Sequence, residues 1–260
     1  MKIHCLIENT CHSGELKAEH GLSLLIEIGG RRILFDTGAS AAFAANAECM
    51  LLDLSTVDAA ILSHGHYDHG GGLERFLELN HKARVWASPH AFEPHFNASG
   101  KDIGLPPTLQ AHPGILRAAA PVTELYPGIT LHQGPQVPML HPTPDAGMST
   151  MQNGIRIPDD FRHEQYLLIQ EEEKRILLSG CSHRGILNIV HHFQPDVLVG
   201  GFHLMKETNA GRITQLAEEL LQFPTVYYTA HCTGEWAVGI MQQRMGSRLR
   251  TFSTGDSLSI

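Results

Sequence analysis

The chain has 260 residues, of which 42% are hydrophobic and 18% are charged, and its formal net charge is −8. This length can bury a substantial core, and the composition is that of an ordinary globular protein, which excludes a largely disordered chain. The negative charge and the absence of a run of Lys and Arg argue against nucleic acid as a partner. No segment approaches the roughly 20 apolar residues that cross a bilayer, so we expect no membrane partner either.

The cellular compartment is indicated by two further features. The first residues, Met1 to Asn9, lack the apolar stretch of a secretory signal. The five cysteines are odd in number and irregularly spaced, a pattern that does not form a disulfide framework. We therefore expect a cytoplasmic protein.

The first clear elements are two apolar runs, 23–28 and 32–38, on either side of Gly29-Gly30. Apolar runs around a Gly-Gly turn predict a β-hairpin. Asp36 lies near the end of the second run, where an aspartate before Gly38 is typical of a capped turn.

A histidine-rich loop follows the apolar run 59–62, with the sequence Ser63-His64-Gly65-His66-Tyr67-Asp68-His69-Gly70-Gly71-Gly72. As the backbone leaves a strand, His64 and His66 point the same way, whereas Asp68 and His69 turn toward a second position, so two metals can share the loop. Imidazole and carboxylate suit zinc best, with iron and manganese as alternatives. Residues 70–72 predict a tight turn and residues 73–79 a helix, which places the site at the carboxyl end of a buried strand.

Residues 87–160 are rich in Pro, Gly, His and Asn, and carry only short strand-like pieces such as 128–132. A long irregular segment in a compact domain is usually functional, and we interpret this one as a cap over the site. A second hairpin is predicted from 166–170 and 175–180.

The remainder alternates between helices and strands. The pattern predicts helices at 185–193, 212–222 and 235–245, and strands at 196–200, 225–229 and 249–253. No internal repeat is present. The simplest packing is one sandwich of two similar layers, so we expect a single domain over 1–260 with the cap inside it.

Further candidate ligands come directly after predicted strands: Cys181, His183, His203 and His231. We expect them at the same edge of the sheets as His64. A single histidine at such a place is more often a hydrogen-bonded core residue than a ligand. Three in the same structural position favour ligands.

The string His-x-His-x-Asp-His after a hydrophobic strand resembles the signature of the metallo-β-lactamase superfamily. The resemblance implies an α/β fold, an αββα sandwich of two mixed sheets with helices outside, holding two divalent metal ions around a bridging hydroxide. The strings 19–23, 180–186, 201–204 and 231–234 narrow it to a subgroup named for an archaeal dihydropterin–ribofuranosylaminobenzene phosphate synthase of methanopterin formation. The similarity spans Asn9 to Gly234.

The resemblance also implies roles for individual residues. Asp36 would support the metal loop without coordinating an ion. The superfamily's Ser-Gly-Asp is Ser179-Gly180-Cys181 here, so that a thiolate, with a zinc–sulfur distance of about 2.3 Å, replaces the bridging aspartate. His231 matches the superfamily's final histidine and would complete the second ion with Asp68 and His69.

The third histidine of the superfamily normally lies near His163, yet His183 is also within reach of the site. We favour His183 first and His163 second as the third imidazole ligand. His203 has no counterpart among the ligands, and we assign it to contact with the substrate or an oxyanion.

These residues predict a dinuclear metal-dependent hydrolase or transferase that acts on a small anionic or ester substrate, phosphorylated substrates included. A metal-bound hydroxide or the metal as Lewis acid would act on the substrate, with Asp68 and His203 as catalytic residues. One alternative is a nucleic-acid phosphodiesterase of the same fold, which needs a basic clamp that the sequence lacks. The other is a non-catalytic redox or metal sensor, which Cys181 motivates because sulfur ligands are sensitive to oxidation.

Overall fold

The structure is a computed structural model that describes residues 1–118, 120–143 and 147–260. The chain divides into two compact units. The first contains residues 1–118, 147–165 and 253–260, and the second contains residues 120–143 and 166–252.

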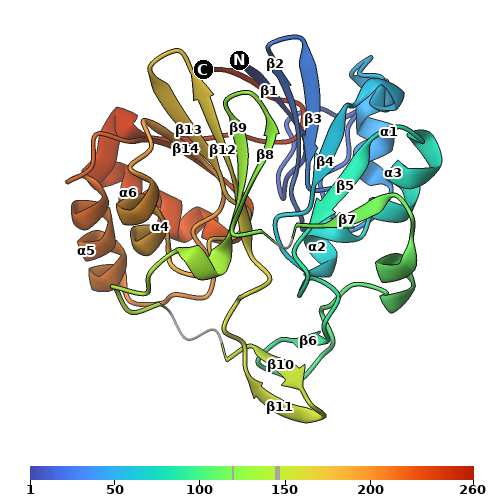
Figure 1. Cartoon of the computed structure of the whole chain (residues 1–260). Helices are drawn as coiled ribbons and strands as arrows, with labels where there is room; N and C mark the ends of the chain where they lie inside the picture. The colour runs from blue at the N-terminus through green and yellow to red at the C-terminus, as the bar shows by residue number, and fades with distance from the viewer. Residues whose placement is uncertain (119, 144–146) are drawn as a thin grey trace. The chain divides into compact units, whose positions relative to one another are not determined.

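A mixed seven-stranded sheet is the frame of the first unit (Figure 1). Its strands, in spatial order, are β17 (Ser257–Ser259), β1 (Lys2–Ile7), β2 (Ser23–Ile28), β3 (Arg31–Phe35), β4 (Ala59–Ile61), β5 (Arg84–Ala87) and β7 (Ile115–Arg117). β2 and β3 pair antiparallel, which confirms the first predicted hairpin. Gly29 and Gly30 both have positive φ, as a two-residue hairpin turn of type I′ requires. From β3 to β7 the pairs are parallel. β4 lies between β3 and β5, and the histidine-rich loop follows its carboxyl end.

Three helices accompany this sheet: α1 (Ala42–Cys49), α2 (Tyr67–Gly70) and α3 (Leu73–Leu79). α3 has the predicted bounds and buries Leu73, Phe76 and Leu77, the spacing of one helix face. These side chains join the apolar core of the unit. The prediction of a tight turn over 70–72 was wrong at Gly70, which is the last residue of α2.

Residues 87–160, predicted as irregular, contain regular structure. A small antiparallel sheet in the order β11 (Ile155–Pro158), β10 (Ser149–Gln152) and β6 (His95–Phe96) belongs to the first unit and lies at the bottom of Figure 1. β7 joins the large sheet. These strands, of two to four residues, are too short to show a period in the sequence, which explains the difference. Residues 119 and 144–146 of this segment lie outside the described residues, and its role as a cap stays a prediction.

The second unit is built on another mixed seven-stranded sheet. The order is β16 (Leu249–Thr251), β15 (Val226–Thr229), β14 (Val197–Val199), β13 (Lys174–Leu178), β12 (Gln165–Glu171), β9 (Ile129–Gln133) and β8 (Val122–Tyr126). β12 and β13 form the second predicted hairpin, and β13 to β16 are parallel. The helices α4 (Ile186–Phe193), α5 (Ala210–Leu220) and α6 (Glu235–Met245) confirm the three predicted helices, with shifts of one or two residues at the ends of α4 and α5.

The helices are short. α5 and α6, at 11 residues each, fall well below the roughly 20 residues that span a bilayer. Within the described ranges, no helix has the length and apolar character needed to cross a membrane.

Candidate metal centre

The loop after β4 gathers the motif histidines of the first unit. His64, His66, Asp68 and His69 are all buried, and the last two lie in α2. The ring centroid of His64 is 4.1 Å from that of His69 and 4.6 Å from that of His66. The structure therefore brings the three imidazoles of the motif close together.

Asp36, at the end of β3, organises this loop. Its Oδ1 accepts the Ser63 amide N–H at 2.6 Å, and its Oδ2 accepts from the Ser63 hydroxyl at 2.6 Å and from Nδ1 of His69 at 2.7 Å. Asp36 is fully buried and has a left-handed backbone (φ 61°), a conformation that is costly for a residue other than glycine.

These hydrogen bonds assign the protons of two imidazoles. An ionised carboxylate only accepts, so the bridging proton lies on Nδ1 of His69, and the single hydroxyl proton of Ser63 is donated to Asp36. The contact of 2.9 Å between Ser63 Oγ and Nδ1 of His64 must then be donated by His64. Both rings therefore carry their lone pair on Nε2, the atom that a metal ion would take.

Glycines in the loop allow close approach of the backbone. A Cβ atom at Gly65 would collide with the carbonyl oxygen of Ala91, and at Gly71 and Gly72 with the backbone of residues 37–40. None of these three glycines has a positive φ. These three positions therefore need glycine because the backbone of neighbouring segments lies too close to leave room for a Cβ atom.

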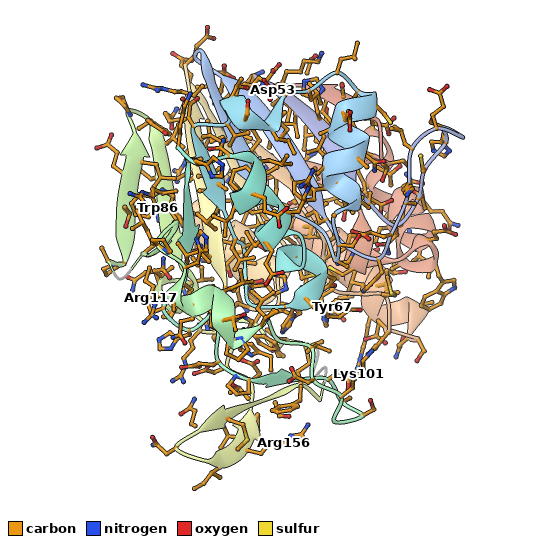
Figure 2. All side chains as sticks on the ribbon, turned by 90° about the vertical axis from the view of Figure 1, so that its right-hand side faces the viewer. Asp53, Tyr67, Trp86, Lys101, Arg117 and Arg156 are labelled. Atoms are coloured by element: carbon orange, nitrogen blue, oxygen red, sulfur yellow. The ribbon has the colours of Figure 1, made fainter. Side chains whose placement is uncertain are left out.

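Asp68, the carboxylate of the motif, lies near two imidazoles. Its Oδ2 is 3.3 Å from Nε2 of His20 and 4.0 Å from Nε2 of His69. His20 was not among the predicted ligands, although it stands in one of the strings that carry the family resemblance. Tyr67, beside Asp68 on α2, is partly exposed, and burial together with that carboxylate raises its pKa (Figure 2).

A second cluster of the first unit contains His66, His95, Asp159 and His163, whose ligand atoms lie within 4.8 Å of one another. His163, a second-choice ligand from the sequence, accepts the Gly65 amide N–H at Nδ1 (2.9 Å). Burial, and then the neighbouring histidines, lower the pKa of His66 well below its ordinary value and that of His163 to about 4, so both rings are neutral at pH 7. Sequence reasoning missed His95 and Asp159. The only signal was that Asp159 precedes His163 by four residues.

In the second unit, the candidates follow the carboxyl ends of adjacent parallel strands. Cys181 and His183 come after β13, His203 after β14 and His231 after β15, so they stand at one edge of that sheet. Ser182, His203 and His231 all have positive φ, and the rings of His183 and His203 are 4.3 Å apart. Left-handed residues concentrated at one sheet edge are typical of functional loops.

Cys181 has two potential co-ligands in the same unit. Its ligand atom and those of His231 and Cys232 lie within 4.8 Å of one another, and all three residues are buried. The thiol of Cys232 also donates to the carbonyl oxygen of Cys181 at 3.5 Å. Cys232 was not a predicted ligand. The assignment of Cys181, His183, His203 and His231 to one dinuclear centre with the loop after β4 stays a prediction.

Comparison with known proteins supports these observations. A family model described as the metallo-beta-lactamase superfamily matches residues 16–154. The chain is 30% identical to the 7,8-dihydropterin-6-methyl-4-(beta-D-ribofuranosyl)-aminobenzene-5'-phosphate synthase of Methanocaldococcus jannaschii, over 90% of this chain and 88% of the synthase.

Solved structures of similar proteins point to the same superfamily. Tm1679, described as a metal-dependent hydrolase of the beta-lactamase superfamily, is 30% identical, with a TM-score of 0.86 over 100% of this chain and 99% of Tm1679. Zn²⁺-bound PqqB from Methylobacterium extorquens, 12% identical, shares the fold alone, with a TM-score of 0.61 over the whole of both chains. The predicted fold class, with two mixed sheets and helices, is confirmed, and the chain belongs to the metallo-β-lactamase superfamily.

Proposed function

We propose that this protein is a metal-dependent enzyme that uses two divalent ions, with zinc as the first choice. It would hydrolyse a small anionic or ester substrate or transfer a group from it. One observation carries the proposal. The hydrogen bonds from Asp36 through Ser63 and His69 fix two buried imidazoles with their lone pairs on Nε2. A carboxylate that orients a histidine in this way is a regular partner of metal-ligating histidines.

The residues fit divalent ions. The donors are imidazole nitrogens and a carboxylate, the set that zinc, iron and manganese prefer. The low pKa of His66 keeps its ring in the neutral form that binds metal, because a protonated imidazole has no lone pair. When bound, such ions supply a Lewis acid and lower the pKa of a water molecule toward 7.

The protein's own side chains would then have distinct roles. Asp36 and Ser63 orient the ligands, while Asp68, next to His20 and His69, supplies a negative charge at the second position. Cys181 and His231 are proposed as the further ligands, with His183 and His163 as candidates for the third imidazole of the first ion. His203, held in a left-handed backbone, is proposed to contact the substrate.

The substrate class rests on the relatives. Tm1679 is described as a hydrolase, whereas the name of the archaeal relative denotes a synthase of a phosphorylated product. We therefore propose a small substrate, with phosphate esters as the first compounds to test. All five cysteines are thiols rather than disulfides, which supports a reducing, cytoplasmic compartment.

The test combines metal analysis with turnover. The purified protein is assayed for bound zinc, iron and manganese, then with phosphodiester, lactone and thioester probes before and after dialysis against EDTA. We expect about two ions per chain, activity on at least one probe that EDTA abolishes, and recovery on adding metal. Full activity of metal-free protein would refute the proposal.

A second candidate function, a metal or redox sensor, is favoured by the cluster of Cys181, His231 and Cys232. Two thiols beside an imidazole bind a soft cation well and lose it on oxidation. Titration with peroxide, following metal content and turnover together, separates the two functions. Release of metal from a protein with no turnover on any probe favours the sensor.

A further inference from the structure

The cluster of His66, His95, Asp159 and His163 contains two residues to which neither the motif nor the proposed centre gives a role. His95 lies in β6 of the small sheet, and Asp159 directly follows β11 of the same sheet. The side chains of both are 1% exposed. Pairing of β6 with β10, and of β10 with β11, therefore delivers an imidazole and a carboxylate to the metal loop.

Asp159 is held in a fixed orientation. Its Oδ1 accepts the amide N–H of Phe161 at 2.8 Å, and its Oδ2 lies 2.8 Å from Nδ1 of His95 and 3.5 Å from Nε2 of His163. The backbone N–H of Phe161 and the two imidazoles all face the oxygens of this buried carboxyl group, so Asp159 acts as an ionised acceptor.

The ionised acceptor determines which nitrogen of His95 carries the proton. Nδ1 must donate to Asp159, so the lone pair of a neutral His95 is on Nε2. Within the part of the chain that the structure describes, this Nε2 is buried and has no hydrogen-bond partner. Its ring centroid is 5.5 Å from that of His66. A buried lone pair without a donor is costly unless a cation or a proton meets it.

Nε2 of His163 is also buried without a hydrogen-bond partner among the described residues, but its protonation differs from that of His95. Because its Nδ1 accepts from the Gly65 amide, the proton of the neutral ring lies on Nε2, which faces Asp159. In this rotamer His163 accepts from the loop at Gly65 and has no lone pair directed at a cation. His95 does.

We propose that His95 is a metal ligand, binding a divalent ion through Nε2 together with His66, and that Asp159 is the positioning residue that sets its tautomer. This inference rests on the proposed function, because His66 is also part of the motif. It adds a ligand supplied by the small sheet, outside the His-x-His-x-Asp-His loop. Imidazole nitrogens such as those of His66 and His95 are donors that suit zinc.

The competing explanation is structural: the cluster would merely tie the small sheet to the rest of the unit. The two explanations differ in metal affinity. The experiment uses the full chain and the variants His95→Gln, Asp159→Asn and His64→Ala, with His90→Gln as matched control. His90 lies in the same segment, and its Nδ1 contacts Glu93 at 2.9 Å on a partly exposed side chain.

Zinc affinity is measured by competition with a chromophoric chelator, and the ligand environment by the visible spectrum of the cobalt-substituted protein. Thermal unfolding of the metal-free forms checks that each variant folds. We expect His95→Gln and Asp159→Asn to weaken zinc binding by about 10- to 100-fold and to change the cobalt spectrum, as loss of a ligand or its partner does. His90→Gln should match the wild type.

The outcomes separate this inference from the proposed function. If His64→Ala weakens zinc binding while His95→Gln binds zinc and cobalt as the wild type does, the inference is overturned and the proposed metal centre stands. If neither variant changes metal binding, both are overturned. If folded His95→Gln and Asp159→Asn both lose affinity, His95 is a ligand and the purely structural explanation fails.

Discussion

Oδ2 of Asp36 lies 2.7 Å from Nδ1 of His69, and neither side chain has any exposed surface. Asp159 and His95 repeat the arrangement at 2.8 Å. In each pair a buried carboxylate fixes a buried imidazole in the tautomer whose Nε2 carries the lone pair. The first pair joins β3 to the motif loop, and the second joins the small sheet to it, so two independent parts of the first unit prepare imidazoles in the same way.

Asp36→Asn should weaken metal binding. The amide group cannot accept all three hydrogen bonds in the same way, so His64 and His69 lose the partners that set their tautomers. We expect about 10- to 100-fold weaker zinc binding. The metal-free protein should lose about 1–3 kcal/mol of unfolding free energy, because buried donors are left unsatisfied. Chelator competition and urea denaturation measure the two effects.

The matched control is Asp53→Asn. Asp53 is an exposed aspartate whose side chain caps a turn by accepting from the Ser55 amide, a role that asparagine also performs. Its zinc affinity should equal that of the wild type. Equal zinc affinity in Asp36→Asn and Asp53→Asn would show that Asp36 does not orient a metal ligand.

Gly65→Ala tests the close packing of the motif loop. The added Cβ would collide with the backbone carbonyl of Ala91, which cannot move aside as a flexible side chain can. We expect a loss of about 1–3 kcal/mol in unfolding free energy, the usual cost of overpacking, and weaker metal binding.

Gly239→Ala, in α6, is the control, for which we expect a change in stability of the opposite sign. Its Cβ would meet no described atom within 4 Å, so it should stabilise the helix by up to about 1 kcal/mol. Equal stabilities of the two variants would contradict this account of the loop.

The sequence predicted the parts of the fold that have local signals. α3 and α6 have the predicted bounds, and both hairpins form, because their patterns span five or more residues and end at clear turns. The motif loop was located for the same reason, since its ligands lie within six residues. α2 was not predicted because four residues cannot show a helical period.

The missed residues depend on contacts far apart in the chain. His95 reaches the loop only through the pairing of a two-residue strand with β10, more than 50 residues later in the sequence. Asp159 meets His95 across 64 residues. Cys232 approaches Cys181 because β15 and β13 both lie beside β14, a relation between strands that no local pattern reveals.

Cys181 should respond differently to two substitutions. If its thiolate binds an ion, Cys181→Ala loses metal, whereas Cys181→Asp, which introduces the residue usual in the superfamily, keeps it. A thiolate-to-cobalt charge-transfer band should appear in the wild type and vanish in both variants. Cys49→Ala, at an exposed cysteine, is the control and should keep the band. A band that persists in folded Cys181→Ala would assign the thiolate ligand elsewhere.

His132 should make stability depend on pH. Burial, and then the positive charges of His192 and Arg175, lower its pKa to about 4 from an ordinary value of 6.5. Above pH 6.5 the ring is neutral in both the folded and the unfolded chain, and its contribution to stability is complete. As the pH falls from 6.5 toward 4, the unfolded chain takes up a proton that the folded chain does not, so the unfolding free energy declines. The decline continues through pH 4 and then levels off.

The variant His132→Gln tests this. The slope of its unfolding free energy against pH, from urea denaturation in EDTA between pH 4 and 7, should be shallower than in the wild type. His81→Gln, at an exposed histidine, should keep the wild-type slope. An unchanged slope in His132→Gln would mean that this ring titrates alike in the folded and unfolded chain.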